Sequence, residues 1–555
     1  MLENRWKLIG VAVSGLLALV FVGAFLTNAW VVDDAYITFR VIDNLLHGRG
    51  LTWNPGERVQ VFTHPLWMLL MSAAAALTGE FFLTNVGVSL LLCMAMLAVA
   101  HRWLSHGGDS WRPALLILLL LSSKAFMDYT SSGLENSLSY LLVALFCVQL
   151  GTGRDAPASL RHLAGLWLTA SLAFVNRHDT LLLYLPTLAW VTWQSARALG
   201  WRIGVPLLLG SLPATAWLLF ATLYYGFPLP NTWYAKVSTR LPLEDRLQRG
   251  FEYFANSLAW DSVSHLLVLG CLILALRRRR AAALLALAGV GLYYVFIVFH
   301  ASATHMSGRF FAVPFCMALL WLAWLWPSPR WAVVVGAALI AYAVWNPIAP
   351  LKMGTRWYHA REQDKNRIDT SYLVHEAGPH VLLNHRGDWR TPDAAWYEAG
   401  LAFRHHPSKV HVGGAQGAEA IGFFGFAAGP EKIVVDYLGI ADPLLARLPA
   451  CNVGSPEHWK SGHFYRIPPK GYFESLARGE NLIVDPGIHA YYDRLAVAVR
   501  DPDLLSWSRI ETIVRLNLGS YDPLLDEPAE RLKAALGGKD CRYFVAGLVG
   551  PFDPR

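Results

Sequence analysis

Long apolar runs are the feature that most constrains this chain. Twelve of them lie before residue 349, and a helix that crosses a bilayer needs roughly 20 apolar residues. Only 16% of the residues are charged, against about a quarter in soluble domains. The chain is therefore predicted to be a polytopic α-helical membrane protein. The runs are 8–30, 65–79, 83–101, 113–127, 134–151, 160–176, 180–195, 203–223, 263–276, 281–300, 310–326 and 331–348.

Basic residues between the runs predict the orientation. Residues 350–555 carry a net charge of −1 and the remainder carries +8, so the total of +7 reflects membrane topology and predicts no nucleic-acid partner. The segment 1–7 and the four arginines 277–280 should both be cytoplasmic. If every run crossed the membrane, nine crossings, an odd number, would separate these two segments and place them on opposite sides. The short run 65–79 is therefore predicted to be a re-entrant or juxtamembrane helix. About 11 transmembrane helices remain, and the residues from 350 onward lie outside the cytoplasm.

This topology predicts two domains and gathers polar residues on one side of the membrane. Residues 1–349 form the transmembrane domain and 350–555 a soluble extracytoplasmic domain. The tail alternates short apolar runs with helix-like stretches, which predicts an α/β domain. Its predicted strands are His380–Asn384, Lys432–Asp436 and Tyr543–Val549, and its predicted helices include Tyr472–Arg478 and Pro528–Leu536. The external segments are 31–64, 128–135, 177–179, 224–262 and 301–309.

Six cysteines are too few for a disulfide scaffold. Cys451 and Cys541 stand in the polar tail. These two cysteines could form a disulfide if the tail lies in an oxidising compartment, and the sequence leaves this open. No Cys and His spacing in the sequence indicates a zinc site.

The first external segment begins with two adjacent carboxylates, Asp33 and Asp34, at the mouth of a predicted membrane helix. A carboxylate at such a boundary can act as a general base, and its neighbour can orient it or hold a cation. The alternative is a solvated helix end. The segment continues with Gly, aromatic and polar residues to His64, a composition unusual for a simple connector.

Eight short motifs occur in order between about residues 30 and 465. The first three are Asp-Asp-Ala-Tyr-Ile-Thr-Phe-Arg at 33–40, Gly-Leu-Thr-Trp-Asn-Pro-Gly-Glu-Arg-Val at 50–59 and Thr-His-Pro-Leu-Trp at 63–67. Then come Ser-Gly-Leu-Glu-Asn at 132–136, Asn-Arg-His-Asp at 176–179, Pro-Asn-Thr-Trp-Tyr-Ala-Lys at 230–236 and Gly-Arg-Phe-Phe at 308–311. The tail adds Val-Asp-Tyr-Leu-Gly-Ile-Ala-Asp-Pro at 435–443, followed by Ala446, Arg447, Gly462 and His463.

In this pattern the chain resembles GT-C membrane glycosyltransferases, and most of all the branch of bacterial arabinofuranosyltransferases. It departs from that pattern with Asn136 in place of Thr and with Trp233 at the first aromatic position. The resemblance implies an inverting transfer of a sugar, arabinofuranose in this branch, from a polyprenyl-phosphate donor. The acceptor would be a hydroxyl of a cell-envelope glycan or a surface protein. The reaction would take place on the extracytoplasmic side of a bacterial cytoplasmic membrane.

Such a reaction needs a base for the acceptor hydroxyl and cations for the departing phosphate. Asp33 and Asp34 are the candidate bases, with a small preference for Asp33. Bidentate guanidinium contacts make Arg309 the first candidate for the phosphate, although an arginine at a helix end can simply reach toward water. Lys236, Arg177 and His305 are further phosphate candidates. The substrate-binding candidates are Arg40, His64, Glu135, His178, Trp233 and Tyr234.

Several alternatives stay open on the sequence. A divalent cation (Mg²⁺, Mn²⁺ or Ca²⁺) would use Asp33, Asp34 or Glu135, yet Glu135 at a helix start is also favoured by the helix dipole alone. The donor sugar can be a hexose. A lipid-linked sugar transporter is a different class, but it would favour ionisable residues in mid-membrane and broken helices. A receptor or scaffold would leave the paired aspartates and Arg309 without a role.

Overall fold

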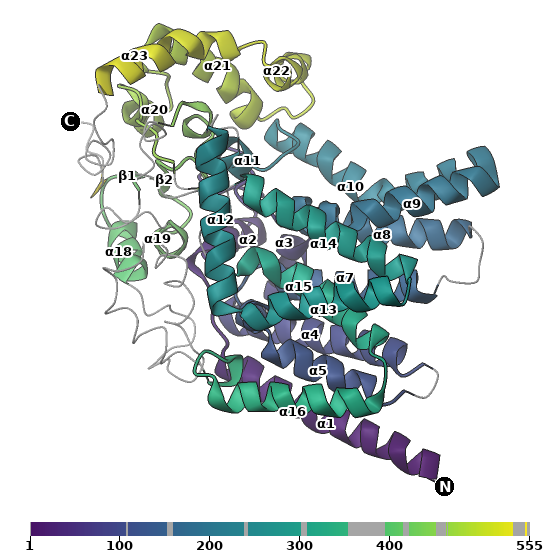
Figure 1. Cartoon of the computed structure of the whole chain (residues 1–555). Coiled ribbons are helices and arrows are strands. Elements are labelled where there is room, and N and C mark those ends of the chain that lie inside the picture. The colour runs from purple at the N-terminus through teal and green to yellow at the C-terminus, as the bar shows by residue number, and fades with distance from the viewer. Residues whose placement is uncertain are drawn as a thin grey trace.

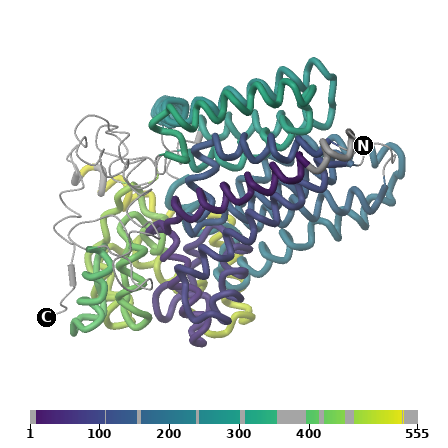
Figure 2. Tube along the Cα trace, turned by 90° about the horizontal axis from the view of Figure 1, so that it is seen from below, coloured from purple at the N-terminus to yellow at the C-terminus, as the bar shows by residue number. Residues whose placement is uncertain are grey.

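The computed structural model describes residues 2–106, 109–152, 159–237, 242–300, 308–352, 395–413, 421–450, 462, 464–536 and 550–551. The predictions for His305, for Cys451 and Cys541, and for strands at 380–384 and 543–549 lie outside these residues. The first part of the chain forms a bundle of helices that run side by side, and the tail gathers at one end of it (Figure 1). Figure 2 shows the N-terminal end of α1 at the opposite end of the bundle.

Every predicted apolar run coincides with a helix, which confirms the predicted polytopic helical architecture. The run 113–127 is divided at Ser123, whose side chain accepts a hydrogen bond from Phe126 N and so starts a second short helix, α6 (Lys124–Asp128). The bundle helices are α1 (Leu2–Thr27), α3 (Pro65–Thr78), α4 (Phe82–Leu104), α5 (Arg112–Ser122), α7 (Asn136–Thr152), α8 (Leu160–Asn176), α9 (Leu181–Leu199), α10 (Gly204–Tyr225), α13 (Ser262–Arg277), α14 (Ala281–His300), α15 (Arg309–Leu325) and α16 (Pro329–Trp345).

By length and apolar composition alone, fewer of these helices qualify as membrane spans. Within the described residues, five helical stretches are long and apolar enough: Ile9–Thr27, Phe82–Leu104, His178–Tyr225, Ala281–Phe299 and Pro329–Lys352. The stretch His178–Tyr225 contains both α9 and α10. A sixth span is possible from α12 (Leu243–Trp260) and α13, which meet at a bend of 97°. The count of about 11 spans and the re-entrant role of α3, which has 14 residues, therefore stay predictions.

Asp261 explains the bend between α12 and α13. Its carboxylate accepts hydrogen bonds from Ser264 N and the Ser264 hydroxyl, which start α13, and from Ala125 N of α6. One buried carboxylate thus satisfies the free N–H groups of two helix starts. As a result α12 crosses the end of the bundle at a steep angle to the other helices (Figure 1).

The described part of the tail combines a small sheet with short helices, as predicted. Its sheet has the order β2–β1–β3, in which β1 (Val410–Val412) pairs parallel with β2 (Ile433–Val435) and antiparallel with β3 (Gly550–Pro551). The predicted helix Tyr472–Arg478 is α20, and the other helices are α18 (Ala395–Arg404), α19 (Gly422–Ala428), α21 (Pro486–Arg500), α22 (Trp507–Asn517) and α23 (Asp526–Leu536). The turn helix η6 (Leu445–Arg447) follows β2.

The buried apolar residues of the tail that the structure describes fall into two clusters, one shared with the bundle and one made mostly of tail residues. Phe423 and Phe424 of α19 belong to the same buried cluster as the bundle helices. Phe227, which follows α10, packs into the buried cluster around Tyr472 and Leu495 of the tail. The division into domains at residue 350 stays a prediction, but both sides of that boundary share apolar contacts.

Candidate active site

The turn that precedes α7 is packed against the start of α2 (Asp33–Leu46). Gly133 has a φ of 85°, and a Cβ at this position would lie 2.5 Å from the Ala35 Cβ, so both the conformation and the space require glycine. Val32 N donates to the Ser132 carbonyl at 3.0 Å, and Trp67 Nε1 donates to the Gly133 carbonyl at 2.9 Å. These contacts place the next acidic residue, Glu135, beside the paired aspartates' helix.

Glu135 is the centre of a buried polar cluster. Its carboxylate accepts hydrogen bonds from Arg177 Nη1 at 2.6 Å and from Arg309 Nη2 at 3.2 and 3.3 Å. His64 Nδ1 lies 3.0 Å from Glu135 Oε2. The Asn176 amide donates to the Glu135 backbone carbonyl at 3.0 Å. Four of the predicted external segments therefore meet at one carboxylate.

The charges around Glu135 keep it ionised. Burial by itself raises the pKa of this carboxyl, but Arg309, Arg177 and His64 outweigh burial and hold its pKa well below the usual range. With 0% of its surface exposed, Glu135 would be costly as an unpaired charge. It is therefore best described as the anion that holds two guanidinium groups in place.

Arg177 is shared between Glu135 and a second carboxylate, Asp179. Arg177 Nε and Nη2 donate to the two Asp179 oxygens at 2.7 and 3.0 Å, a bidentate pair. The Tyr293 hydroxyl also donates to Asp179, at 3.0 Å. Arg177 lies over the Phe310 ring, 4.4 Å from its centroid. The phosphate role predicted for Arg177 stays a prediction, and its contacts show that it also has a structural role.

Arg309 begins α15 directly after Gly308, whose φ is 76°. Both Arg177 and Arg309 reach Glu135 from turns at the tail end of the bundle, and each side chain is 11% exposed. The next residue, Phe310, donates its backbone N–H to the Tyr253 hydroxyl of α12 at 3.2 Å. This places Arg309 where α12, α15 and the Glu135 turn meet.

The two adjacent aspartates have different surroundings. Asp33 is 5% exposed, and its oxygens accept from Gly422 N at 2.9 Å and Phe423 N at 2.7 Å, the first residues of α19. Asp34 is partly exposed, and within the described residues it has no hydrogen-bond or ion-pair partner. The small preference for Asp33 as base is therefore not supported by these contacts, because its carboxylate already caps a tail helix.

Asp34 lies on the face of α2 that points to the cluster. Asp34 and Thr38 are one helical turn apart, so they share a face. The Thr38 hydroxyl lies 2.8 Å from His64 Nε2, and the other nitrogen of His64 faces Glu135. A partner-free carboxylate, an imidazole and the Glu135–Arg309 pair are thus arranged along one side of the turn.

Gly422 gives a direct test of the contact between Asp33 and α19. A Cβ at Gly422 would lie 1.9 Å from the Asp33 carbonyl oxygen, so we expect Gly422→Ala to lower the free energy of unfolding by about 1–3 kcal/mol. Gly270 in α13 has open space around it, so Gly270→Ala should be neutral or stabilising by up to about 1 kcal/mol. Denaturant unfolding in detergent measures both. Equal stability of the two variants would contradict the docking of α19 on Asp33.

Arg40, a predicted substrate-binding residue, does not contact the Glu135 cluster but binds the tail. Its guanidinium donates to the Gly425 and Lys432 carbonyls at 2.9 and 2.7 Å and lies 4.4 Å from the Trp53 ring centroid. It therefore joins α2 to the tail, away from the Glu135 cluster.

His178 follows Arg177 in the chain, and its ring packs edge-on against Phe174. Substrate binding by Arg40 or by His178 stays untested.

The residues predicted on α11 (Asn231–Lys236) form a second polar region against the tail. Arg447 of η6 stacks between Phe227 and Tyr234, at 3.9 and 4.4 Å from their ring centroids. Asn231 donates to the Gly439 and Asp442 carbonyls at 2.8 and 3.0 Å. Trp233 is 42% exposed, and Lys236 ends α11. Asn231 and Tyr234 are thus brought together with the tail.

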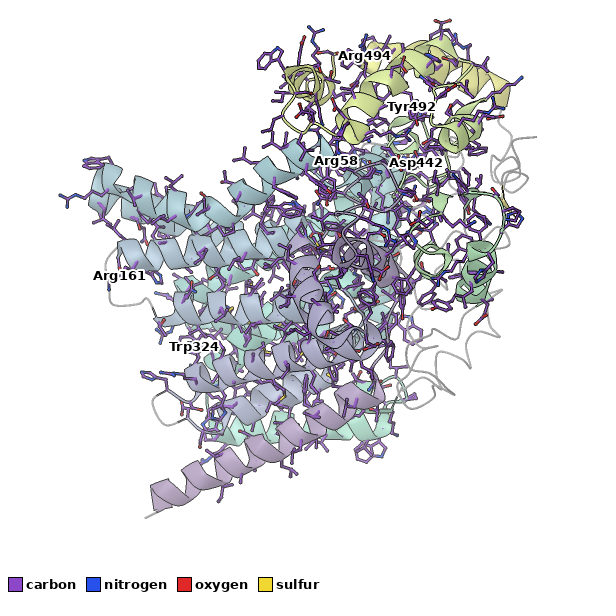
Figure 3. The ribbon with its side chains drawn as sticks, turned by 180° about the vertical axis from the view of Figure 1, so that it is seen from behind. Arg58, Arg161, Trp324, Asp442, Tyr492 and Arg494 are labelled. Atoms are coloured by element: carbon purple, nitrogen blue, oxygen red, sulfur yellow. The ribbon has the colours of Figure 1, made fainter. Side chains whose placement is uncertain are left out.

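A pocket opens in this second region. It is lined by side chains of the first external loop, the α10–α11 segment and the tail: Arg58, Val59, Gln60, Tyr225, Phe227, Leu229, Asn231, Tyr234, Pro443, Arg447 and Val499. Gln60 Oε1 and the Tyr225 hydroxyl are buried and have no hydrogen-bond partner in the described part of the chain. Figure 3 shows Arg58 and Asp442 at the same junction between the bundle and the tail.

Asp442 predicts how stability depends on pH at this junction. Burial, reinforced by Glu57, raises the pKa of Asp442 to about 7. Because the folded-state pKa exceeds the unfolded value, the folded protein binds this proton more tightly, and stability falls as the pH rises from about 4 to about 7. The carboxylate accepts from Leu444 N, Leu445 N and the Tyr472 hydroxyl.

In the Asp442→Asn variant the asparagine has the same shape as the aspartate, but it cannot ionise. We expect the variant to match the unchanged protein at pH 4 and to exceed its free energy of unfolding at pH 8 by about 1 kcal/mol or more. Denaturant unfolding at the two pH values measures the difference. A variant that is less stable than the unchanged protein at pH 8 would contradict the proton on Asp442.

Four residues of the cluster were not among the predicted site residues: Thr38, Asn176, Asp179 and Tyr293. Asp179 and Thr38 stand within the recognised motifs, and the Arg-x-Asp spacing at 177–179 was a signal for an ion pair. Tyr293 lies in an apolar run, and nothing in its local sequence indicates its contact with Asp179.

The predicted cation ligands do not form a metal site. The described residues contain no group of three or more His, Cys, Asp or Glu side chains arranged to hold an ion. Asp33 binds backbone N–H groups, and Glu135 binds two arginines. Of the three predicted carboxylates, Asp34 alone is left without such donors among the described residues.

Comparisons with known proteins agree with the resemblance that the motifs indicate. No family model matches the chain. The terminal β-(1→2)-arabinofuranosyltransferase of Mycobacterium tuberculosis is 27% identical over 272 residues, which cover 45% of this chain and 42% of that protein. The enzyme of the same name from Corynebacterium glutamicum is 25% identical over 230 residues, 38% of this chain and 33% of that protein. The chain thus spans less than half the length of these curated relatives.

Solved structures with a similar arrangement include ArnT from Cupriavidus metallidurans bound to undecaprenyl phosphate. It has a TM-score of 0.48 and 15% identity, over 78% of this chain and 86% of that one. The Archaeoglobus fulgidus oligosaccharyltransferase tethered to an acceptor peptide has a TM-score of 0.43 and 12% identity, over 79% of this chain and 64% of that one. In sequence, the resemblance to bacterial arabinofuranosyltransferases that the motifs predict is confirmed over slightly less than half of the chain.

Proposed function

We propose that the chain is an inverting membrane glycosyltransferase of the GT-C type. It moves a sugar, arabinofuranose, from a polyprenyl-phosphate donor to a hydroxyl of a cell-envelope glycan or surface protein. The observation that carries this proposal is the position of Asp34, which has no hydrogen-bond or ion-pair partner among the described residues. It lies one helical turn from Thr38, whose hydroxyl contacts His64 of the Glu135–Arg309 cluster. The names of the two curated relatives support arabinofuranose as the sugar.

The residues divide the reaction between them. Asp34 accepts the proton of the acceptor hydroxyl as the acceptor oxygen attacks the anomeric carbon of the donor sugar. The bond from that carbon to the phosphate oxygen breaks, and its electron pair leaves with the polyprenyl phosphate. Arg309 stabilises the charge on the phosphate. A single displacement from the opposite face inverts the anomeric centre.

Glu135 has a positioning role in this proposal. It neutralises and orients Arg309 and Arg177 before the donor arrives, through bonds that begin in separate turns. The site is preorganised because the cations are already fixed when the phosphate binds. A divalent cation has no ready ligand set among the described residues, and the steps above involve none.

A transfer assay in nanodiscs tests the proposal. The purified chain is mixed with radiolabelled polyprenyl-phosphate arabinofuranose and an arabinan oligosaccharide, and the product anomer is determined. A labelled product of inverted configuration is the expected result. Transfer from a polyprenyl-phosphate hexose instead would replace the sugar assignment. Movement of the labelled donor across vesicles without transfer would identify a transporter.

A further inference from the structure

The tail helix α22 exposes an unusual amount of apolar surface. Trp507 is 77% exposed, Val514 51% and Leu518 77%, and Leu505 just before the helix is 70% exposed. Trp507, Val514 and Leu518 are spaced by seven and four residues, so they form one stripe along the helix. The charged residue in this stripe, Glu511, is paired with Arg515 at 2.6 Å.

This helix is fastened to the end of a membrane-span candidate. Arg509, which is buried, donates to the Leu223 and Tyr224 carbonyls at the C-terminal end of α10, at 2.6 and 3.1 Å. Asn517 donates to the Gly226 carbonyl at 2.8 Å. Figure 1 shows α22 beside the end of α10 that is nearest the tail. The α22 backbone is therefore held at the level where α10 ends.

The apolar stripe is adjacent to a surface that already faces lipid in the predicted topology. The last turns of α10 expose Leu219 by 60%, Phe220 by 36% and Leu223 by 42%, and α10 belongs to a stretch that qualifies as a membrane span. Arg509 contacts the carbonyl of Leu223 itself. The exposed apolar surface thus continues from the transmembrane helix onto the tail.

We propose that α22 and Leu505 insert into the outer surface of the bilayer and that lipid is their partner. A tryptophan at the end of such a stripe suits the membrane interface, where one side of the ring is apolar and the other meets water. Single exposed apolar residues are ordinary in soluble domains, whereas a contiguous patch marks an interaction surface. Continuity with the lipid-facing side of α10 selects the bilayer as that surface.

This contact would fix the tail at one height above the membrane. Arg509 also bonds to the Ala498 carbonyl of α21, and Arg58 of the first external loop contacts the α21 end through the Asp501 carbonyl. The first external loop, α21 and α22 are therefore one connected unit. Insertion of α22 holds the pocket beside Arg58 close to the lipid headgroups, independently of which sugar the protein transfers.

Spin labelling measures the depth of α22 directly. Leu518→Cys carries a nitroxide in the full-length chain in nanodiscs, and Glu480→Cys, an exposed tail position after α20, is the matched control. Collisions of the label with oxygen, which concentrates in lipid, are compared with those of a water-soluble nickel chelate. The unmutated chain, treated identically, corrects for labelling of native cysteines.

We expect the ratio of oxygen to nickel collisions to be several-fold higher at position 518 than at position 480. Equal ratios at the two positions would show a solvated stripe and overturn the proposal. Low rates with both reagents and an immobilised spectrum at 518 would show that a protein surface covers α22, which also overturns it. Because Leu518 is 77% exposed, the label replaces no packed side chain.

Discussion

Replacing Asp34 by Asn should lower kcat for sugar transfer by about 10²–10⁴-fold, the usual contribution of a general base. The unfolding free energy should stay within about 0.5 kcal/mol of the original, because Asp34 holds no hydrogen bond or ion pair among the described residues. The KM for the lipid donor should change little. Steady-state kinetics with the labelled donor in nanodiscs, together with denaturant unfolding, measure the three quantities.

Two other aspartates of α2 serve as controls for Asp34. Asp43→Asn changes a carboxylate that is 33% exposed and lies beside His47, and this variant should leave kcat unchanged. Asp33→Asn should cost about 1–3 kcal/mol of stability, because one of the two α19 N–H groups then faces an amide donor and is left unsatisfied. A large loss of kcat in a stable Asp33→Asn protein, with normal turnover by Asp34→Asn, would assign the base to Asp33.

Replacing Glu135 by Gln should lower the free energy of unfolding by about 3–5 kcal/mol, because a buried charge network loses its central anion. Arg177 would keep Asp179, whereas Arg309 would keep one amide oxygen as acceptor and would face an amide N–H₂ group in place of the other oxygen. We also expect sugar transfer to fall strongly, since the negative charge that orients Arg309 would be removed. Denaturant unfolding and the transfer assay measure the two effects separately.

Glu431→Gln is the matched control for Glu135→Gln. Glu431 also pairs with an arginine, Arg49, at 3.4 Å, but its side chain is 80% exposed. Exposed pairs contribute about 0–1 kcal/mol, so this variant should unfold like the original. If the two glutamine variants had the same stability, the buried network around Glu135 would not exist as described.

The order of the helices could be predicted from sequence because it depends on local composition. In a membrane, a run of about 20 apolar residues folds as a helix, because a helix satisfies the hydrogen bonds of its backbone N–H and C=O groups within the segment. The break at Ser123 was not predicted, since it depends on the capping of α6 and on Asp261, which lies 136 residues further along the chain from Ala125. Local patterns carry no information on such distant partners.

The candidate site could be predicted in part. The positive-inside rule placed the polar turns on one side, and His64, Glu135, Arg177 and Arg309 do meet there. Arg40 carried the same motif signal but lies against Trp53 and the tail. Charge and motif spacing indicate that a residue belongs to one of these motifs, but they do not indicate which partner its side chain meets.

The sequence by itself determined the helical membrane architecture and the resemblance to arabinofuranosyltransferases, and it predicted which polar segments are external, because hydrophobic runs, short motifs and charge bias are local properties. Only the tertiary structure shows that Asp33 has hydrogen-bond partners and that Asp34 has none among the described residues. That difference depends on α19, nearly 390 residues away from Asp33 in the chain, whose backbone N–H groups bind Asp33 at 2.7 and 2.9 Å. Adjacent side chains point in different directions, and what each one meets is set by the packing of distant segments.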